Sequence, residues 1–148
     1  MPDSLTVGTS QVMISQSGKT LGVMIDTNLT MKNQALDLVR TATFELRRIY
    51  SIRHYLSVEA TPKLALAIVM SRLDYCNSLL YRCPQYLINR LQKVQNGAAH
   101  LILKVPKTDY ITPHLQTLHW LPVNARIQYK ICSLCFNAIN PSGLQYLA

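Results

Sequence analysis

The stretch QYLINRLQKVQNGAAHLILK, residues 85–104, decides the fold class of this chain. It follows the Cys83-Pro84 step and stops before Pro106, and prolines at such places are typical of helix boundaries. At about 100° per residue, its apolar side chains fall on one stripe. The members of this stripe are Leu87, Leu91, Val94, Ala98, Leu101 and Val105. The stretch therefore predicts an amphipathic helix with one face in a core.

Two further helices are expected before this stretch. Apolar residues recur at three- and four-residue steps between Ala35 and Leu56, which predicts a long amphipathic helix. Thr61-Pro62 then has the pattern of an N-cap followed by proline at the first helical position. It opens a second apolar helix that is expected to run through Leu73.

Two more helices are expected after it. Thr112-Pro113 repeats the cap-plus-proline pattern and predicts a short helix, which ends before an apolar corner at residues 119–122. A last helix is expected from about Val123 to Ile139. Its predicted inner face consists of Ile127, Ile131, Leu134, Cys135 and Ala138.

The first 29 residues have a different pattern. Short β-type runs at 5–7 and 12–14 precede a predicted turn at 16–19, and residues 21–25 predict a second strand. A lone hairpin is only marginally stable in water, so we expect it to belong to a larger sheet. The chain is therefore expected to be mostly α, with a β-hairpin over 1–29 and a bundle of five or six helices over 30–148.

Composition bounds the class of protein. The 148 residues are 49% apolar and 15% charged, which predicts one ordered domain rather than a disordered chain. Fifteen Lys and Arg stand against seven Asp and Glu, for a formal net charge of +8. A basic balance of this kind favours a polyanionic partner, either nucleic acid or an anionic membrane.

The cysteines and the N-terminus bear on the compartment. The sequence MPDSLTVGTSQVM lacks the basic and apolar regions of a secretory signal, and no stretch has the pattern of a membrane span. The four cysteines, at 76, 83, 132 and 135, are therefore expected to be free thiols. We expect an intracellular protein, nuclear or cytoplasmic, that is not secreted.

A second stripe of the helix at 85–104 carries positive charge. It contains Arg90, Lys93, Gly97, His100 and Lys104, and no acidic residue occurs between Asp74 and Asp109. Such a row suits a phosphate backbone, and the glycine would allow close approach, although a solvated helix face is the alternative. A weaker group of candidate nucleic-acid-binding residues lies on the first long helix. Its members are Arg40, Arg47 and Arg48.

Metal and catalytic groupings are not expected. Cys132 and Cys135, with His114 and His119, are residue types of a zinc site, but the helical pattern around the cysteines favours buried structural thiols. The aspartates at 26, 74 and 109 stand in different segments, so no carboxylate pair for two-metal chemistry is visible. No Gly-rich phosphate loop and no G-x-S-x-G sequence occurs.

Five blocks of the sequence carry a family resemblance. SRLDYCNSLL at 71–80 resembles a block of LINE-type, jockey-like non-LTR retrotransposon reverse transcriptases. RLQKVQN at 90–96, LHWLP at 118–122 and RIQYK at 126–130 resemble further blocks of that family, in the same order. LGVMID at 21–26 resembles the strand that follows its polymerase palm.

The resemblance implies the end of a palm followed by the thumb of an RNA-directed DNA polymerase. Such a thumb grips an RNA/DNA template-primer duplex without reading its sequence, and it adjoins the palm domain of the parent polymerase. The catalytic carboxylates, which bind Mg²⁺ in the parent enzyme, belong to a part of the palm that this sequence does not contain. The chain is thus expected to have no catalytic residues, no cofactor of its own, no small-molecule substrate and no membrane partner.

Two other functions remain open at this point. The chain is alternatively a relic of a retroelement without a function, or a helical protein-interaction module. Binding to polyanions that weakens steeply with salt would favour the nucleic-acid grip over both alternatives.

Overall fold

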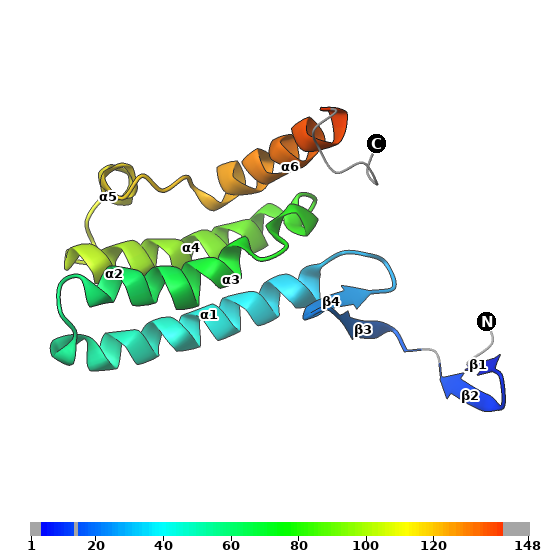
Figure 1. Cartoon of the computed structure of the whole chain (residues 1–148). Helices are drawn as coiled ribbons and strands as arrows, with labels where there is room; N and C mark the ends of the chain where they lie inside the picture. Colours follow the sequence, from blue (N-terminus) through cyan, green and yellow to red (C-terminus); the bar gives the residue numbers. More distant parts are fainter. Residues whose placement is uncertain (1–3, 14, 141–148) are drawn as a thin grey trace.

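The computed structural model describes residues 4–13 and 15–140, and this part of the chain is mostly helical (Figure 1). Four short strands come first: β1 (Ser4–Val7), β2 (Ser10–Met13), β3 (Ser17–Thr20) and β4 (Val23–Asp26). The long helices are α1 (Lys32–Ile52), α4 (Gln85–Leu103) and α6 (Val123–Ile139), and α5 (Ile111–Thr117) is short. The predicted fold class, mostly α after an N-terminal β-hairpin, is confirmed.

The N-terminal strands form two hairpins, whereas the sequence predicted one. β1 pairs with β2, and β3 pairs with β4, each antiparallel. The predicted turn at 16–19 is wrong, because residues 17–20 are strand β3 and the turn is Leu21-Gly22. Both turn residues have positive φ, 49° and 82°, as a two-residue hairpin turn requires. Ile14, at the end of a predicted run, lies outside the described residues.

The hairpin β3–β4 is fixed to the helices. The Met24 amide donates a hydrogen bond to Gln34 Oε1 on α1 at 2.8 Å, and the Tyr75 hydroxyl donates to the Leu21 carbonyl at 2.7 Å. Val23 is buried. In contrast, β1–β2 stands away from the helices (Figure 1).

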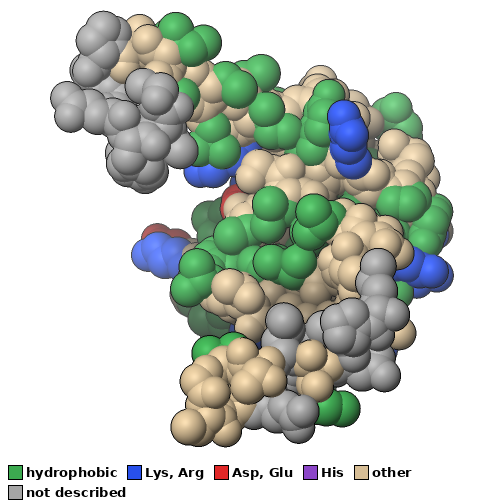
Figure 2. Space-filling view, turned by 90° about the vertical axis from the view of Figure 1, so that its right-hand side faces the viewer, with side chains coloured by type: hydrophobic (Ala, Val, Ile, Leu, Met, Phe, Trp, Pro, Cys, Tyr) green, Lys and Arg blue, Asp and Glu red, His purple; other side chains and the backbone are tan. Residues whose placement is uncertain are grey.

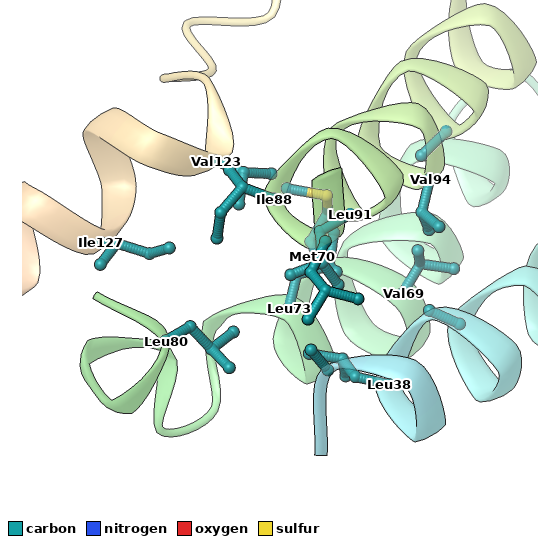
Figure 3. Close-up of a cluster of buried hydrophobic side chains, with 14 of the residues drawn as sticks. Leu38, Val69, Met70, Leu73, Leu80, Ile88, Leu91, Val94, Val123 and Ile127 are labelled. Carbon is teal, nitrogen blue, oxygen red and sulfur yellow. The ribbon is translucent and has the colours of Figure 1, made fainter. Parts of the chain in front are cut away.

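Three helical rods form the core. α1 and α4 run in the same direction and pack against each other, and a third rod packs against both of them and runs in the opposite direction (Figure 1). The third rod joins α2 (Ala60–Leu64), the π-helical η2 (Ala65–Met70) and α3 (Ser71–Asp74). Short 3₁₀ turns η1 (Arg53–Tyr55) and η3 (Asn77–Leu80) follow α1 and α3. Figure 3 shows Leu38, Val69, Leu73 and Leu91 among the buried side chains that these elements contribute, together with Ile127 from α6.

The predicted caps are displaced from the observed helix starts. α2 begins at Ala60, and its amide donates to Ser57 Oγ at 3.1 Å, so Thr61 is not the cap. Thr61 instead lies in the first turn, buried, with its hydroxyl donating to the Ser57 carbonyl. α5 likewise begins at Ile111, one residue before Thr112. A proline is tolerated anywhere in the first turn of a helix, so the pattern found the helices but not their first residues.

α6 has the predicted bounds but not the predicted inner face. Val123 and Ile127 are buried and Ile131 packs against the core, whereas Leu134 and Cys135 are exposed. The reason is that α6 packs against η3 and α4 only near its beginning and then extends past them (Figure 1). Figure 2 shows the end of this helix as a lobe that overhangs the body of the molecule. Among the described residues, no helix combines the length and apolar character needed to cross a membrane.

Candidate nucleic-acid interface

A groove between α1 and α4 collects four cations. Arg47 and Lys93 come from the two helices, Arg53 comes from η1 and Lys107 comes from the loop after α4. The groove has a volume of about 840 Å³. Its full lining, which defines the α1–α4 groove, is Thr43, Leu46, Arg47, Tyr50, Arg53, Lys93, Asn96, Gly97, His100, Leu101, Val105, Pro106 and Lys107. Among the described residues no carboxylate lines it.

Gly97 lies on the floor of the groove, where α4 contacts α1. A Cβ built on this residue would lie 2.8 Å from Leu46 Cδ2 on α1. Gly97 therefore lets α4 approach α1 closely, which corrects the expectation that the glycine serves the approach of a phosphate backbone. Thr43, Leu46 and Arg47 recur at helical spacing on α1. Lys93, Asn96 and Gly97 do the same on α4, so both walls of the groove are regular helix faces.

The acidic side chains near the groove have other partners. Glu45 on α1 forms ion pairs with Arg48 at 3.1 Å and Arg72 at 3.8 Å. Asp109, after α4, lies 3.9 Å from His114. Within the described part of the chain, none of the four groove cations has a carboxylate within ion-pair distance. Their charge is therefore available to an anion from solvent.

Tyr50 marks the far end of the groove. The Arg53 guanidinium carbon lies 5.4 Å from the centre of its ring, and Lys107 Nζ lies 5.9 Å from it. Both distances are within the range of cation–π attraction, which holds these two cations beside the ring. The ring remains accessible, because Tyr50 is 54% exposed.

His100 lines the groove as a neutral group. Burial lowers the pKa of its imidazole below the ordinary value of 6.5, and the neighbouring His114 lowers it further. The two rings meet edge to face with centroids 6.2 Å apart. His100 Nδ1 is buried and accepts no hydrogen bond from the residues that the structure describes. At neutral pH this residue therefore adds polarity rather than charge.

The structure brings three of the predicted site residues together in the groove: Arg47, Lys93 and His100. Arg90 is exposed on α4 about one turn before Lys93. Lys104 is exposed too, but it follows the end of α4 and has left-handed φ, so it does not continue the helical stripe as predicted. Arg40 is exposed about two turns before Arg47. Arg48 is directed elsewhere, since it pairs with Glu45 and lies over the Phe44 ring.

Two groove cations were not among the predicted residues. Arg53 follows the end of α1, and Lys107 follows a chain reversal after Lys104, which has left-handed φ of 56°. Neither belongs to a helical stripe that sequence spacing can extend. The only available signal was the absence of acids from residues 75–108, which includes Lys107.

The cysteines do not form a metal site. Cys132 and Cys135 are exposed, which corrects the expectation of buried thiols. In residues 4–13 and 15–140, no three His, Cys, Asp or Glu side chains are placed to hold a metal ion. Cys83 is half-buried, and burial raises the pKa of its thiol.

The sequence blocks at 71–80, 90–96, 118–122 and 126–130 are joined by polar side chains. Asp74 accepts two hydrogen bonds from the Arg126 guanidinium, one of them from Nε at 2.8 Å. Gln92 Oε1 accepts from the Val123 amide at 2.8 Å, and Gln95 Nε2 donates to the Leu121 carbonyl at 2.9 Å. These bonds attach the beginning of α6 to α3 and α4.

Comparison with known proteins identifies no relative of this chain. No protein-family model, no curated protein and no solved structure matches the chain significantly.

Proposed function

We propose that the chain binds the sugar-phosphate backbone of nucleic acid in the α1–α4 groove, without base specificity and without catalysing a reaction itself. The observation that carries the proposal is the convergence of Arg47, Arg53, Lys93 and Lys107 on one concavity whose described lining contains no carboxylate. Cations placed in this way recognise phosphate and carry no sequence information.

The family resemblance supports the same function. A thumb-like fragment of a retroelement RNA-directed DNA polymerase would hold a template-primer while chemistry occurred in the palm. The chain's net charge of +8 attracts any polyanion at long range. This attraction does not depend on where the cations lie, so it would act even without a groove. Local convergence is what separates a binding site from a generally basic surface.

A charge-matched pair of variants tests the proposal. In the groove variant, Arg47, Arg53, Lys93 and Lys107 are replaced by Gln. In the control variant, four exposed cations outside the groove, Lys19, Lys32, Lys63 and Arg82, are replaced by Gln, so both lose the same formal charge.

Fluorescence anisotropy with a labelled oligonucleotide then measures the affinity of each variant across a salt series. Wild-type dissociation constants are expected in the non-specific range of about 10⁻⁴ to 10⁻⁶ M at physiological salt. The groove variant should lose most of the salt-dependent affinity, and the control variant should keep most of it. Equal losses in the two variants would show a diffuse field and would leave the relic and protein-interaction alternatives in place.

A further inference from the structure

We infer that the occupant of the α1–α4 groove is a single, unpaired strand, and that Tyr50 stacks on one of its bases. The inference rests on the proposed function and specifies the form of nucleic acid that the groove takes. It differs from the duplex that the family resemblance implies.

The width of the groove excludes a duplex from its floor. α1 and α4 are in direct contact at Leu46 and Gly97, where even a Cβ would be too close. The axes of packed helices lie about 8–10 Å apart. A DNA duplex is wider than this, since its major groove alone is about 12 Å across and admits a whole helix. A trough between two touching helices therefore has room for one strand.

The length of the groove matches a few nucleotides. Its α1 wall extends from Thr43 to the end of the helix, and Arg53 follows directly. Ten residues of helix span roughly 15 Å. The rise along the axis of a stacked strand is about 3.4 Å per nucleotide, so about four nucleotides span this length. The groove offers four cations to them.

Tyr50 adds an exposed aromatic ring, which a site that binds only the phosphate backbone would not need. An exposed aromatic ring inside a cationic groove is the combination by which proteins hold single strands, because every base has a face that can stack. Lys107 is exposed, and its flexible side chain can move from the ring to a phosphate when a strand enters, which frees a ring face for a base. In a duplex the bases are already stacked on each other and cannot use this ring.

The experiment compares strand forms and tyrosine variants in the full chain. The probes are a labelled single strand of about 8 nucleotides, within the usual site size for such grooves, and the blunt duplex of the same sequence. The variants are Tyr50→Ala and, as a matched control, Tyr55→Ala, since Tyr55 is 90% exposed and does not line the groove. Circular dichroism checks that both variants remain folded.

The single strand should bind more tightly than the duplex. Tyr50→Ala should weaken single-strand binding by about fivefold or more, as expected for the loss of one base–aromatic stack, and leave the salt slope unchanged. Tyr55→Ala should bind like the wild type. Tighter or equal binding of the duplex would overturn the inference, and so would equal behaviour of the two tyrosine variants.

The two proposals fail in different ways. If only the strand form is wrong, removing the groove cations still abolishes the salt-dependent binding of the duplex. If the proposed function is wrong, removing them affects neither probe more than removing the control cations does.

Discussion

Asp74 and Arg126 form a two-pronged ion pair across 52 residues of sequence, and it joins the end of α3 to α6. Arg126 is the less exposed partner, with a quarter of its side chain accessible to solvent. α6 packs against the bundle only near its beginning. This ion pair and the side-chain amides of Gln92 and Gln95 therefore determine the orientation of α6 relative to the bundle.

A double-mutant cycle measures the strength of that pair. Asp74→Ala, Arg126→Ala and the double variant are compared by urea unfolding monitored by circular dichroism. The pair is bidentate but partly exposed, so we expect a coupling free energy of about 1 kcal/mol. The local pair Glu45–Arg48, three residues apart on α1 with the Arg48 side chain 66% exposed, is the control and should give about 0.3 kcal/mol. Equal coupling in the two cycles would mean that the long-range pair does not hold α6.

Gln95 should matter more to stability than its neighbours on α4. Its side chain is fully buried, donates to the Leu121 carbonyl and accepts from Gln92 Nε2. Gln95→Ala removes both bonds and leaves a cavity, and we expect it to lower the free energy of unfolding by about 2–4 kcal/mol. Asn89→Ala, at an exposed position of the same helix, should change it by less than about 0.5 kcal/mol. Chemical denaturation of the two variants decides the point.

His100 should make the fold less stable in acid. Its pKa is lowered in the folded chain, so the unfolded chain binds more protons once the pH falls below about 6.5. The free energy of unfolding should therefore fall as the pH drops from 6.5 to the lowered pKa, and the loss is complete below it. Asp109, Lys107 and His114 face this imidazole and shape the shift.

The comparison variant for this pH effect is His100→Gln, which cannot be protonated. Its stability should depend less on pH than that of the wild type over the same interval. His54→Gln, at an exposed position, is the matched control for replacing a histidine by glutamine. Urea titrations at several pH values measure all three proteins. If the free energy of unfolding of His100→Gln depends on pH as strongly as that of the wild type, groups other than His100 cause the effect.

Much of the fold follows from local patterns in the sequence. The apolar stripe at 85–104 predicted α4 nearly to the residue, because a 3.6-residue period and two prolines are local properties. The face of α6 could not be predicted in this way. Its apolar stripe continues to Ala138, but burial of these side chains depends on whether η3 and α4 pack along the whole helix, and they do so only near its beginning. The turn at Leu21-Gly22 was hidden because leucine rarely adopts positive φ.

The candidate site was predictable only in part. Lys93 and His100 share a stripe of α4, which spacing reveals, and Arg47 lies on a predicted helix. That α1 and α4 meet side by side is a tertiary fact, so the groove and its Arg53 and Lys107 could not be derived from the sequence. The absence of a Cβ at Gly97 does permit a close approach, as predicted, but the group that approaches is the Leu46 side chain.

The outer half of α6 should promote self-association. Phe136 is 67% exposed and Ile139 is 82% exposed on a helix that extends beyond the bundle. Exposed apolar side chains of this size favour association because it removes them from water. Phe136→Glu together with Ile139→Lys should shift the protein toward monomer in sedimentation velocity over a concentration series. The control is Val58→Lys, which replaces an apolar residue that is 74% exposed and distant in sequence from α6. This variant should self-associate like the wild type.

The cations at the two ends of the groove should contribute only to longer strands. Arg40 and Arg90 precede the groove-lining residues of their helices, and Lys104 comes directly after the end of α4. α1 and α4 run in the same direction, so Arg40 and Arg90 lie at the same end (Figure 1). A strand of about 4 nucleotides fills the groove alone, whereas one of about 16 nucleotides extends past both ends.

Replacing Arg40, Arg90 and Lys104 together by Gln should therefore leave binding of the short strand nearly unchanged. With the long strand, the same variant should flatten the log–log salt slope by roughly 2, since each lost phosphate contact in a single strand is worth about 0.7. Arg48→Gln is the control, because Arg48 is held by Glu45 and lies over the Phe44 ring. The contrary outcome is that the triple variant lowers the affinity for the short strand as much as that for the long one. In that case these cations act at a distance rather than by contact, and the proposed path of the strand along α1 and α4 is wrong.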